Sequence, residues 1–174
     1  VRSTYMDTMG TLVSQGKKDR DLEAVNDRIV TGITYTKGLS QIKVDGEKHD
    51  FNLQLNVFKT MAEHKISVDF INVTPFSLAY TVESHHAEKA SRLIRSLGYE
   101  VKVTPCCAKV AVVGAGMAGQ PGVMAQIVKA LTQEEIEILQ SVDSHTTIWL
   151  LVKEEVVGKA VNALHHQFQL GQRK

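Results

Sequence analysis

The fold of this chain is decided by residues 109–168, KVAVVGAGMAGQPGVMAQIVKALTQEEIEILQSVDSHTTIWLLVKEEVVGKAVNALHHQF. Apolar residues occur there in a short run, then at every third or fourth position, then in two β-rich runs before a second helical pattern. The predicted elements are a strand at 110–113, a helix at 123–131, strands at 136–142 and 146–152, and a helix at 154–168. This β-α-β-β-α order is one strand short of a ferredoxin-like unit.

A second copy of the pattern lies 70 residues upstream, the separation between Gly46 and Gly116. The offset holds without a gap from about Ile42 to Leu97, so the chain contains an internal repeat. Further identities at this offset are Lys59 with Lys129, Ile66 with Ile136, Val82 with Val152 and Ala90 with Ala160. The predicted elements of this copy are strands at 41–44, 66–73, 77–83 and 99–103, and helices at 53–64 and 86–97. This copy therefore has all four strands.

The later copy must take its fourth strand from elsewhere, because only residues 169–174 follow Phe168. The unassigned β-rich segment is RIVTGITYT, residues 28–36. We therefore predict that one module is inserted in the other. Module 1 covers 39–104, and module 2 combines 28–38 with 105–170. The fold class is α+β, with two ferredoxin-like βαββαβ modules and antiparallel sheets.

Composition narrows the function classes. The chain has 174 residues, 43% apolar and 22% charged, with a formal net charge of +1. This balance is typical of globular proteins and does not favour nucleic acid or an anionic membrane as a partner. The sequence lacks an apolar run long enough to span a membrane and the pattern of a secretory signal, so a cytoplasmic protein is expected. Cys106 and Cys107 are neighbours at the junction of the modules and do not predict a disulfide framework.

A glycine motif suggests a nucleotide site. Gly114, Gly116 and Gly119 follow an apolar strand with the spacing of the dinucleotide fingerprint, and Asp143 lies at a suitable distance downstream. However, Pro121 would stand early in a helix that the third glycine should already have entered, and the first copy repeats the elements without these glycines. We favour a turn at 119–122 with Pro121 near the first helical position. A nucleotide-dependent enzyme using this loop remains an alternative.

Other polar clusters do not predict catalysis or metal binding. The seven histidines are neighbours in sequence or isolated, without ligand-type spacing. Ser141, Asp143, Ser144 and His145 resemble a hydrolase set in composition but lie in one strand-turn-strand, without the geometry of a nucleophile and its base. Both copies place a helix N-terminus after their first strand, at 49–52 and 119–122. Free N–H groups there favour a carboxylate, and a simple tight turn is the alternative for each loop.

Several segments carry a resemblance to a known family. KVAVVGAGMAGQPGV, ILQSVDSHTTIWLLV and AVNALHHQF resemble the C-terminal regulatory half of bacterial aspartokinases, which contains paired ACT domains. VRSTYMDTMGTLV is similar to the end of the aspartokinase catalytic domain, which implies that residues 1–27 are a tail of that domain and a linker. KISVDFINVTP together with QSVDSHTTIW most resembles the diaminopimelate-sensitive class.

The resemblance implies a parent protein that phosphorylates aspartate with ATP and Mg, on the route to lysine, threonine and methionine. This chain lacks the KFGGTS-type phosphate-binding segment of the family. It is therefore expected to be a non-catalytic regulatory fragment or subunit, without a cofactor of its own. Its implied partners are an amino-acid effector, a second copy in a homodimer, and a catalytic aspartokinase domain or subunit. An ACT-type amino-acid sensor of another enzyme is the alternative.

The resemblance also implies effector-binding residues, because the family binds amino acids at ACT–ACT interfaces through the loop before the first helix and the following strand. The implied residues are His49, Asp50, Asn52, Val68 and Asp69 in module 1, and Met117, Gly119, Gln120, Gly122, Glu137 and Ile138 in module 2. Many members have an acidic residue followed by x-Pro-Gly in the first loop. This chain departs from that pattern with HDFN at 49–52, and in the second loop Gly119 stands in the place of the acid.

Overall fold

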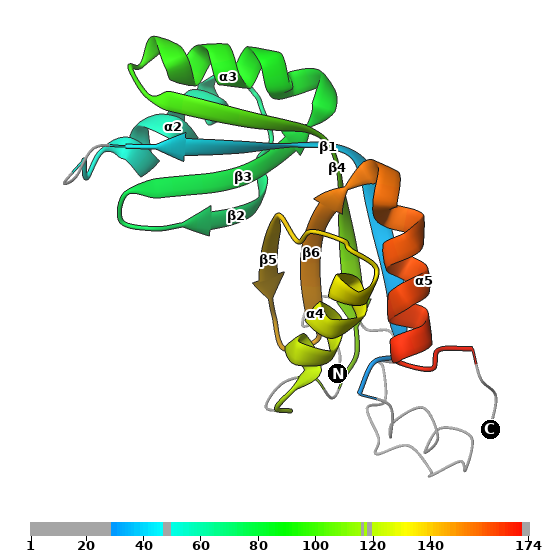
Figure 1. The fold of residues 1–174 in the computed structure, drawn as a ribbon. Coiled ribbons are helices and arrows are strands. Elements are labelled where there is room, and N and C mark those ends of the chain that lie inside the picture. The colour runs from blue at the N-terminus through cyan, green and yellow to red at the C-terminus, as the bar shows by residue number, and fades with distance from the viewer. Residues whose placement is uncertain (1–28, 47–49, 116, 118–119, 172–174) are drawn as a thin grey trace, which may run out of the picture.

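The computed structural model describes residues 29–46, 50–115, 117 and 120–171, so the expected kinase tail at 1–27 lies outside the described residues. The described strands form one sheet in the order β2-β3-β1-β4-β6-β5 (Figure 1). The strands are β1 (Gly32–Asp45), β2 (Asp69–Val73), β3 (Ser77–Glu83), β4 (Glu100–Val113), β5 (Gln140–Asp143) and β6 (Thr147–Lys153). The helices are α2 (Leu53–Glu63), α3 (Ala87–Ser96), α4 (Val123–Gln133) and α5 (Val157–Gln167), with short 3-10 turns η1 (Ser84–His86) and η2 (Glu154–Val156).

Two long strands, β1 and β4, are shared by both modules. Each has 14 residues, and they pair antiparallel from Gly32 opposite Val113 to Asp45 opposite Glu100. The second half of β1 also pairs with β3, while the second half of β4 pairs with β6. The first half of β1 therefore supplies the fourth strand beside the second half of β4. This arrangement confirms the predicted fold class, with one ferredoxin-like module inserted in the other.

The sequence suggested four shorter strands where the structure has these two. Of the two earlier predicted strands, residues 32–36 and 41–44 belong to β1. Of the two later ones, residues 100–103 and 110–113 belong to β4. The register shifts between Thr36 and Leu39 and shifts back between Leu39 and Gln41. Gly38 has φ +77° and Cys106 has φ +54°. One extra residue on each strand is thus absorbed in a bulge, and pairing continues past the turn-prone positions.

Strands β2 and β5 begin later than predicted, for one shared reason. Lys65 and Glu135 take left-handed conformations, with φ +56° and +57°, directly after α2 and α4. The N–H of Ile66 then donates to Met61 O, and that of Ile136 to Leu131 O, at 2.9 Å each. These bonds close the helix ends. Ile66 and Ile136 are consequently core residues at the helix termini, and pairing starts only at Asp69 and Gln140.

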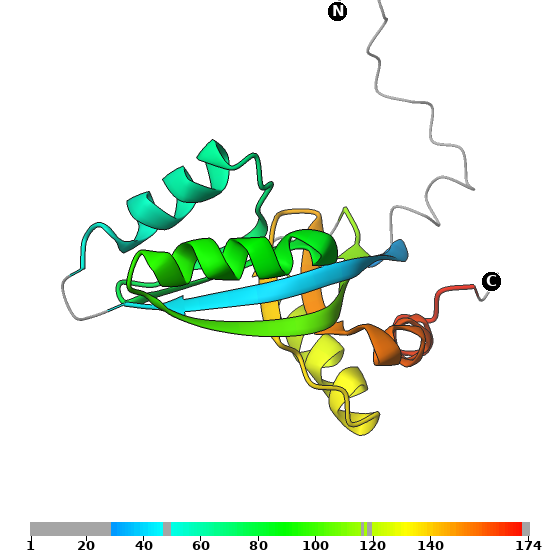
Figure 2. The same ribbon diagram turned by 90° about the horizontal axis from the view of Figure 1, so that it is seen from above.

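Each module has its own hydrophobic core between its helices and its half of the sheet. The core of module 1 joins Ile42 and Val44 of β1 with buried residues of α2 and α3. The core of module 2 joins Val110 and Val112 of β4 with buried residues of α4 and α5, and it includes Val30. The two helix pairs lie on opposite sides of the long strands (Figure 2). Among the described residues, no helix is long and apolar enough to cross a membrane.

The sheet faces turned away from the helices meet in a third, smaller core, which we call the joint. Its buried members are Leu39, Phe70, Cys107 and Leu151, and Leu139, Val142 and Trp149 pack against them. Leu39 and Cys107 pair directly across β1 and β4, beside the two bulges. The joint thus holds the two half-sheets together at the point where the long strands change direction.

Candidate functional site

The loop before α2 presents polar groups at the N-terminus of that helix. Asp50 Oδ1 accepts a hydrogen bond from the Asn52 N–H at 3.0 Å, and Asp50 O accepts one from Leu53 N at 3.3 Å. Asn52 is the N-cap residue, and its side chain makes no capping bond within the described chain. His49 lies outside the described residues. The carboxylate of Asp50 is therefore fixed beside the first turn of α2, where backbone N–H groups favour an anion.

Two further residues join this loop that the sequence did not indicate. Asn56 Nδ2 donates to the Tyr99 hydroxyl at 3.0 Å, across 43 positions of sequence. Burial and the nearby Asp50 carboxylate raise the pKa of Tyr99, and they outweigh the opposing bond from Asn56. Asp50, Asn56 and Tyr99 thus form one polar group. The only available signal was the position of Asn56 one helical turn after Asn52, since Tyr99 reaches the loop through the tertiary fold.

The loop before α4 has a different character. The Gln120 N–H donates to Met117 O at 3.2 Å, and Gly122 caps α4 with φ +90°, a left-handed conformation that glycine adopts readily. Gln120 is exposed, but the Met117 side chain is only 6% exposed and belongs to the core of module 2. Gly119 lies outside the described residues. A ligand at this loop would contact backbone atoms and the Gln120 side chain, whereas the Met117 side chain packs in the core.

Val68 and Asp69 lie away from the loop of their own module. Asp69 pairs with Thr81, which pairs with Gln41, whereas the loop follows Asp45 four positions further along β1. At about 3.3 Å per residue this separation is more than 10 Å. Val68 packs partly against the core of module 1. The structure therefore does not bring the two parts of the predicted set together within one chain.

Module 2 repeats this separation. Glu137 is exposed, Ile138 packs against the core, and both precede β5 at the end of the module opposite Gln120 and Gly122. Each module thus offers two half-sites, one at the helix N-terminus and one at the start of the edge strand. A ligand that touches both kinds of half-site must be bound between two modules.

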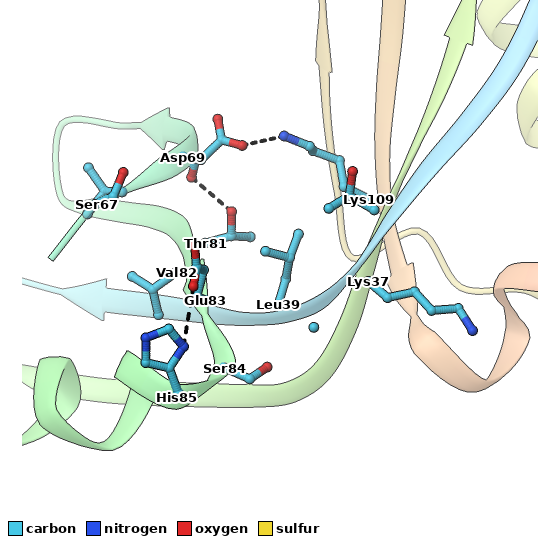
Figure 3. A pocket seen from close by; sticks show the side chains of 13 residues that line it. Lys37, Leu39, Ser67, Asp69, Thr81, Val82, Glu83, Ser84, His85 and Lys109 are labelled. Atoms are coloured by element: carbon cyan, nitrogen blue, oxygen red, sulfur yellow. Dashed lines mark hydrogen bonds and ion pairs between the residues drawn. The ribbon is translucent and has the colours of Figure 1, made fainter.

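A cleft of about 640 Å³ lies beside the joint, between the start of β2, the end of β3 and the bulge of β1 (Figure 3). It is lined by residues of both charges. Lys109 forms an ion pair with Asp69, and His85 Nδ1 lies 3.3 Å from Glu83 Oε2. Val68 and Asp69 of the predicted set line this cleft, and so does Lys109 of module 2. The sequence did not predict Lys109 in this place.

Comparison with known proteins places this architecture. Residues 102–166 match the ACT domain family. Aspartokinase 1 of Bacillus subtilis (strain 168) is 49% identical over 170 residues, which is 98% of this chain and 42% of that protein. The regulatory subunit of aspartate kinase from Thermus thermophilus is 29% identical, with a TM-score of 0.72 over 81% of this chain and 99% of that chain. Over nearly its whole length the chain is similar to aspartokinases, and its fold is similar to that of their solved regulatory subunits.

A second solved structure agrees with this similarity to aspartokinases. The structure of the aspartokinase alpha and beta subunits matches with a TM-score of 0.75 and 26% identity, over 81% of this chain and 99% of that chain. The chain spans less than half the length of the curated aspartokinases that it matches, 42% of the one from Bacillus subtilis. The solved regulatory subunits are matched over nearly their whole length, so the two-module unit is a recurring architecture of this family.

Gly114 of the glycine motif has a packing role. A β-carbon at Gly114 would lie 1.9 Å from Ile29 O and 2.9 Å from Val30 Cα, both backbone atoms. Gly116 and Gly119 lie outside the described residues. The close approach of the chain entering β1 therefore explains why residue 114 is glycine without a bound nucleotide.

The two cysteines of the chain lie in different surroundings. Burial raises the pKa of the Cys107 thiol, so this cysteine is protonated at neutral pH and a poor nucleophile. Cys106 is exposed, and both cysteines are free and lie within β4. In the described part of the chain, no three His, Cys, Asp or Glu side chains gather closely enough to hold a metal ion.

Proposed function

We propose that this chain is the allosteric part of an aspartate kinase, and that an end-product amino acid bound between ACT modules changes the rate of aspartate phosphorylation by ATP. Supporting this, 98% of the chain aligns with Aspartokinase 1 at 49% identity. The phosphorylation itself, with ATP and Mg, would belong to the catalytic domain or subunit in the cytoplasm. An effector acts on such an equilibrium only through unequal affinity for two arrangements, with a typical coupling of about 1–3 kcal/mol.

The observation that carries the proposal is the polar group at the N-terminus of α2. Free backbone N–H groups in the first turn suit the carboxylate of an amino acid, and the Asp50 carboxylate with the Tyr99 hydroxyl suits its ammonium group. His49 and Asn52 belong to the same proposed half-site. In module 2, the proposed half-site at α4 consists of Gln120, Gly122, Gly119 and the backbone of Met117, whose side chain packs in the core.

The second half of each site is proposed to come from another copy of the chain. Val68 and Asp69 precede or open the edge strand β2, and Glu137 and Ile138 precede the edge strand β5. Exposed apolar side chains lie on β2 and in the turn after it, with Ile71 43%, Val73 45% and Phe76 46% exposed. An edge strand with such neighbours is suited to pairing with another chain. We therefore propose a homodimer in which effector sites close at the interface between modules 39–104 and 28–38 plus 105–170.

meso-Diaminopimelate is the proposed effector, with lysine or threonine as the alternatives. Diaminopimelate carries an amino-acid head group at both ends, so it could engage a helix N-terminus on one module and an edge strand on another. Lysine or threonine has only one such head group. The separated half-sites described above therefore favour the longer, two-headed ligand.

Isothermal titration calorimetry of this chain with meso-diaminopimelate, lysine and threonine in parallel tests the proposal. We expect saturable binding of diaminopimelate. Asp50→Asn should weaken it by about tenfold, the loss of a charge-assisted contact of about 1.4 kcal/mol. Asp143→Asn is the matched control, because Asp143 ends the edge strand of the other module. The affinity of this variant for diaminopimelate should equal that of the wild type. Binding of none of the three, by this chain or by the full-length kinase, would contradict the proposal.

Sedimentation velocity tests the dimer separately. Val73→Lys places a charge on the exposed β2 edge and should shift the chain towards monomer. Val128→Lys is the matched control, since Val128 is similarly exposed, at 40%, but lies on α4. A wild-type chain that stays monomeric at high concentration, with and without effector, would rule the homodimer out.

A further inference from the structure

Strand β2 is irregular where its counterpart β5 is regular. Asp69 pairs with Thr81, but Asn72 pairs with Ala79, so β2 contains one more residue than β3 between these pairs. β5 pairs with β6 without a shift from Gln140 to Asp143. At the repeat offset of 70 residues, Phe70 corresponds to Gln140. The bulge is therefore a feature of module 1 alone.

The bulge places Phe70 in an unfavourable backbone conformation. Its φ is +55°, in the left-handed region that a bulky residue rarely occupies. Such a conformation persists only where surrounding contacts hold it. Within the segment, the Phe70 N–H donates to Asp69 Oδ1 at 2.7 Å, and the Thr81 hydroxyl donates to Asp69 O at 3.1 Å.

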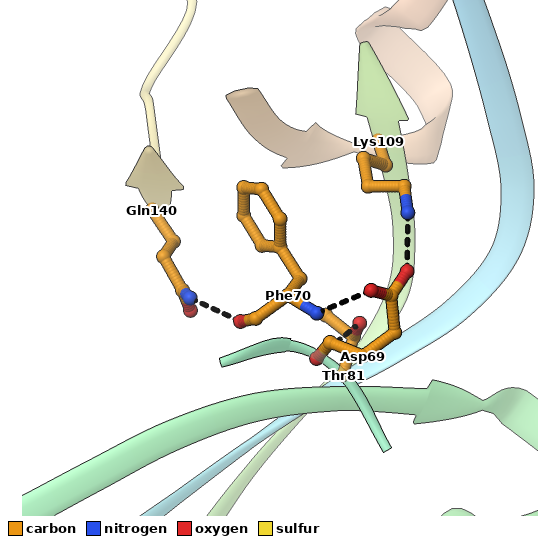
Figure 4. A network of polar contacts seen from close by, with 5 residues as sticks. All are labelled: Asp69, Phe70, Thr81, Lys109 and Gln140. Carbon is orange, nitrogen blue, oxygen red and sulfur yellow. Dashed lines mark hydrogen bonds and ion pairs between the residues drawn. The ribbon is translucent and has the colours of Figure 1, made fainter. Parts of the chain in front are cut away.

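The contacts that hold the bulge from outside come from module 2 (Figure 4). Lys109 of β4 binds the Asp69 carboxylate, and the Gln140 amide of β5 donates to Phe70 O. Gln140 is itself fixed, because its side-chain oxygen accepts a bond from Gln41 Nε2 at 2.8 Å. The Lys109 side chain is only 15% exposed and its ammonium lies 4.7 Å from the Trp149 ring centroid. Both clasping groups are therefore preorganised.

The Phe70 ring completes this contact. The residue is 5% exposed and packs in the joint with Leu39, Cys107 and Leu151. A side chain from the edge strand of module 1 is thus buried against β4 and β6 of module 2. The bulge turns a residue of β2 into an anchor between the modules.

We infer that Lys109 and Gln140 form a clasp that selects the bulged register of β2, and that β2 has a second, unbulged register which release of the clasp populates. The second copy displays that register, since Gln140 pairs with Leu151, which corresponds to Phe70 opposite Thr81. There Phe70 regains an ordinary extended φ, while the Asp69 contacts made in the bulged register are lost. A ligand or partner that binds the β2 edge more tightly in one register shifts the population towards that register. It thereby changes whether module 1 is held to module 2 by the clasp. This inference is independent of the identity of any effector.

The test is hydrogen exchange and backbone NMR of the whole chain without ligand. Lys109→Met keeps the aliphatic stem and removes the ammonium group. We expect faster exchange of the β2 amides, by about tenfold or more, with little change in β5, and a shift of the Phe70 Cα and Cβ resonances towards extended values. Lys109→Arg should restore both readouts, because its guanidinium can also bind Asp69.

Lys153→Met is the matched control. Lys153 is another lysine of module 2, paired in the sheet with Cys107 of the joint. It donates to Pro105 O at 3.2 Å, and within the described residues no hydrogen bond or ion pair joins it to β2. It should leave β2 unchanged. The inference is overturned if Lys109→Met leaves β2 exchange and the Phe70 resonances as in the wild type. It is also overturned if exchange rises equally in all strands, or if Lys153→Met has the same effect on β2.

Discussion

The hydroxyl of Tyr80 is the most unusual polar group in the core of module 1. The residue is fully buried, and its hydroxyl has no hydrogen-bond partner among the described residues. Burial raises the pKa of Tyr80 well above its ordinary value, so the side chain stays neutral. Folding removes the hydrogen bonds that such a hydroxyl makes to water. Because no hydrogen bond to the protein takes their place, its burial lowers the stability of the fold.

Tyr80→Phe is therefore expected to raise the free energy of unfolding by about 1 kcal/mol, because the ring packing remains and the unsatisfied hydroxyl is removed. Urea denaturation measures this change. Tyr99→Phe is the control, since the Tyr99 hydroxyl accepts a bond from Asn56, and it should have no stabilising effect. A clear loss of stability in Tyr80→Phe would contradict the expectation.

Asp69 gives the protein a defined dependence on acid. Burial alone would raise the pKa of Asp69, but the bonds from Lys109 and the Phe70 N–H, together with the charge of Lys109, hold it below the ordinary 3.8. A group with a lowered pKa in the folded state contributes stability above its unfolded pKa, and this contribution is lost as the pH falls through the folded pKa.

We expect the wild type to lose more stability than Asp69→Asn when the pH falls from 6 to below about 3.8. The comparison uses urea denaturation at several pH values. Lys109→Met should lose the same part of the acid dependence, because it removes the partner of the same carboxylate. If Asp69→Asn retains the full wild-type dependence, the ion pair does not contribute.

The residues that could be named from sequence are those whose role depends on local chain geometry. Gly122 was predicted in the loop before α4 because a Pro-Gly pair predicts a turn before a helix, and the structure has it at the N-cap. Tyr99 and Lys109 could not be named, because each reaches its partner across 40 or more positions. Such contacts depend on how elements pack, which local patterns do not report.

At the scale of elements, two glycines should respond in opposite directions. Gly114→Ala would drive a β-carbon into the backbone of Ile29 and should lower the free energy of unfolding by about 1–3 kcal/mol. Gly158 stands exposed in α5 with open space around it, so Gly158→Ala should raise stability by up to about 0.5–1 kcal/mol. Thermal unfolding of both variants measures the contrast. Equal effects would mean that the approach of Ile29 does not constrain residue 114.

The helices were predicted closely, while the strands were divided too finely. Residues 53–64 were expected as a helix and α2 covers Leu53–Glu63, since apolar spacing is a local signal. The predicted strands stopped before Gly38 and before Pro105, yet the bulges keep β1 and β4 continuous. Whether a turn-prone residue ends a strand or forms a bulge depends on the partner strand, and this partner was supplied by a segment far away in sequence.

At the scale of the molecule, the shared strands should make unfolding cooperative. Val30 is buried in the core of module 2 and Val44 in that of module 1. Val30→Ala and Val44→Ala should each lower stability by about 1–3 kcal/mol and shift one common transition. Trp149, the sole tryptophan, reports the joint by fluorescence, and far-UV circular dichroism reports the helices. Transitions at different denaturant concentrations would show that the modules unfold separately.

The insertion of one module in the other was predictable because the later copy lacked a strand and one β-rich segment was left over. The meeting of the two inner sheet faces was not. In β6, Leu150 and Val152 belong to the core of module 2 and Leu151 belongs to the joint, so the apolar residues are consecutive and alternation does not indicate a second core. The bend of β1 and β4 and the bulge of β2 together bring Phe70 from one module into contact with the other.

The pairing of Gly32 with Val113 also orders events in time during synthesis on the ribosome. Residues 32–36 emerge early, but their partners 109–113 emerge only after all of module 1 has been made. Module 1 can close first, through the pairing of 41–45 with 100–104. That closure aligns 32–36 beside 109–113 and removes most of the entropic cost of joining two such distant segments. The inserted module therefore acts as the assembly guide for the module that surrounds it.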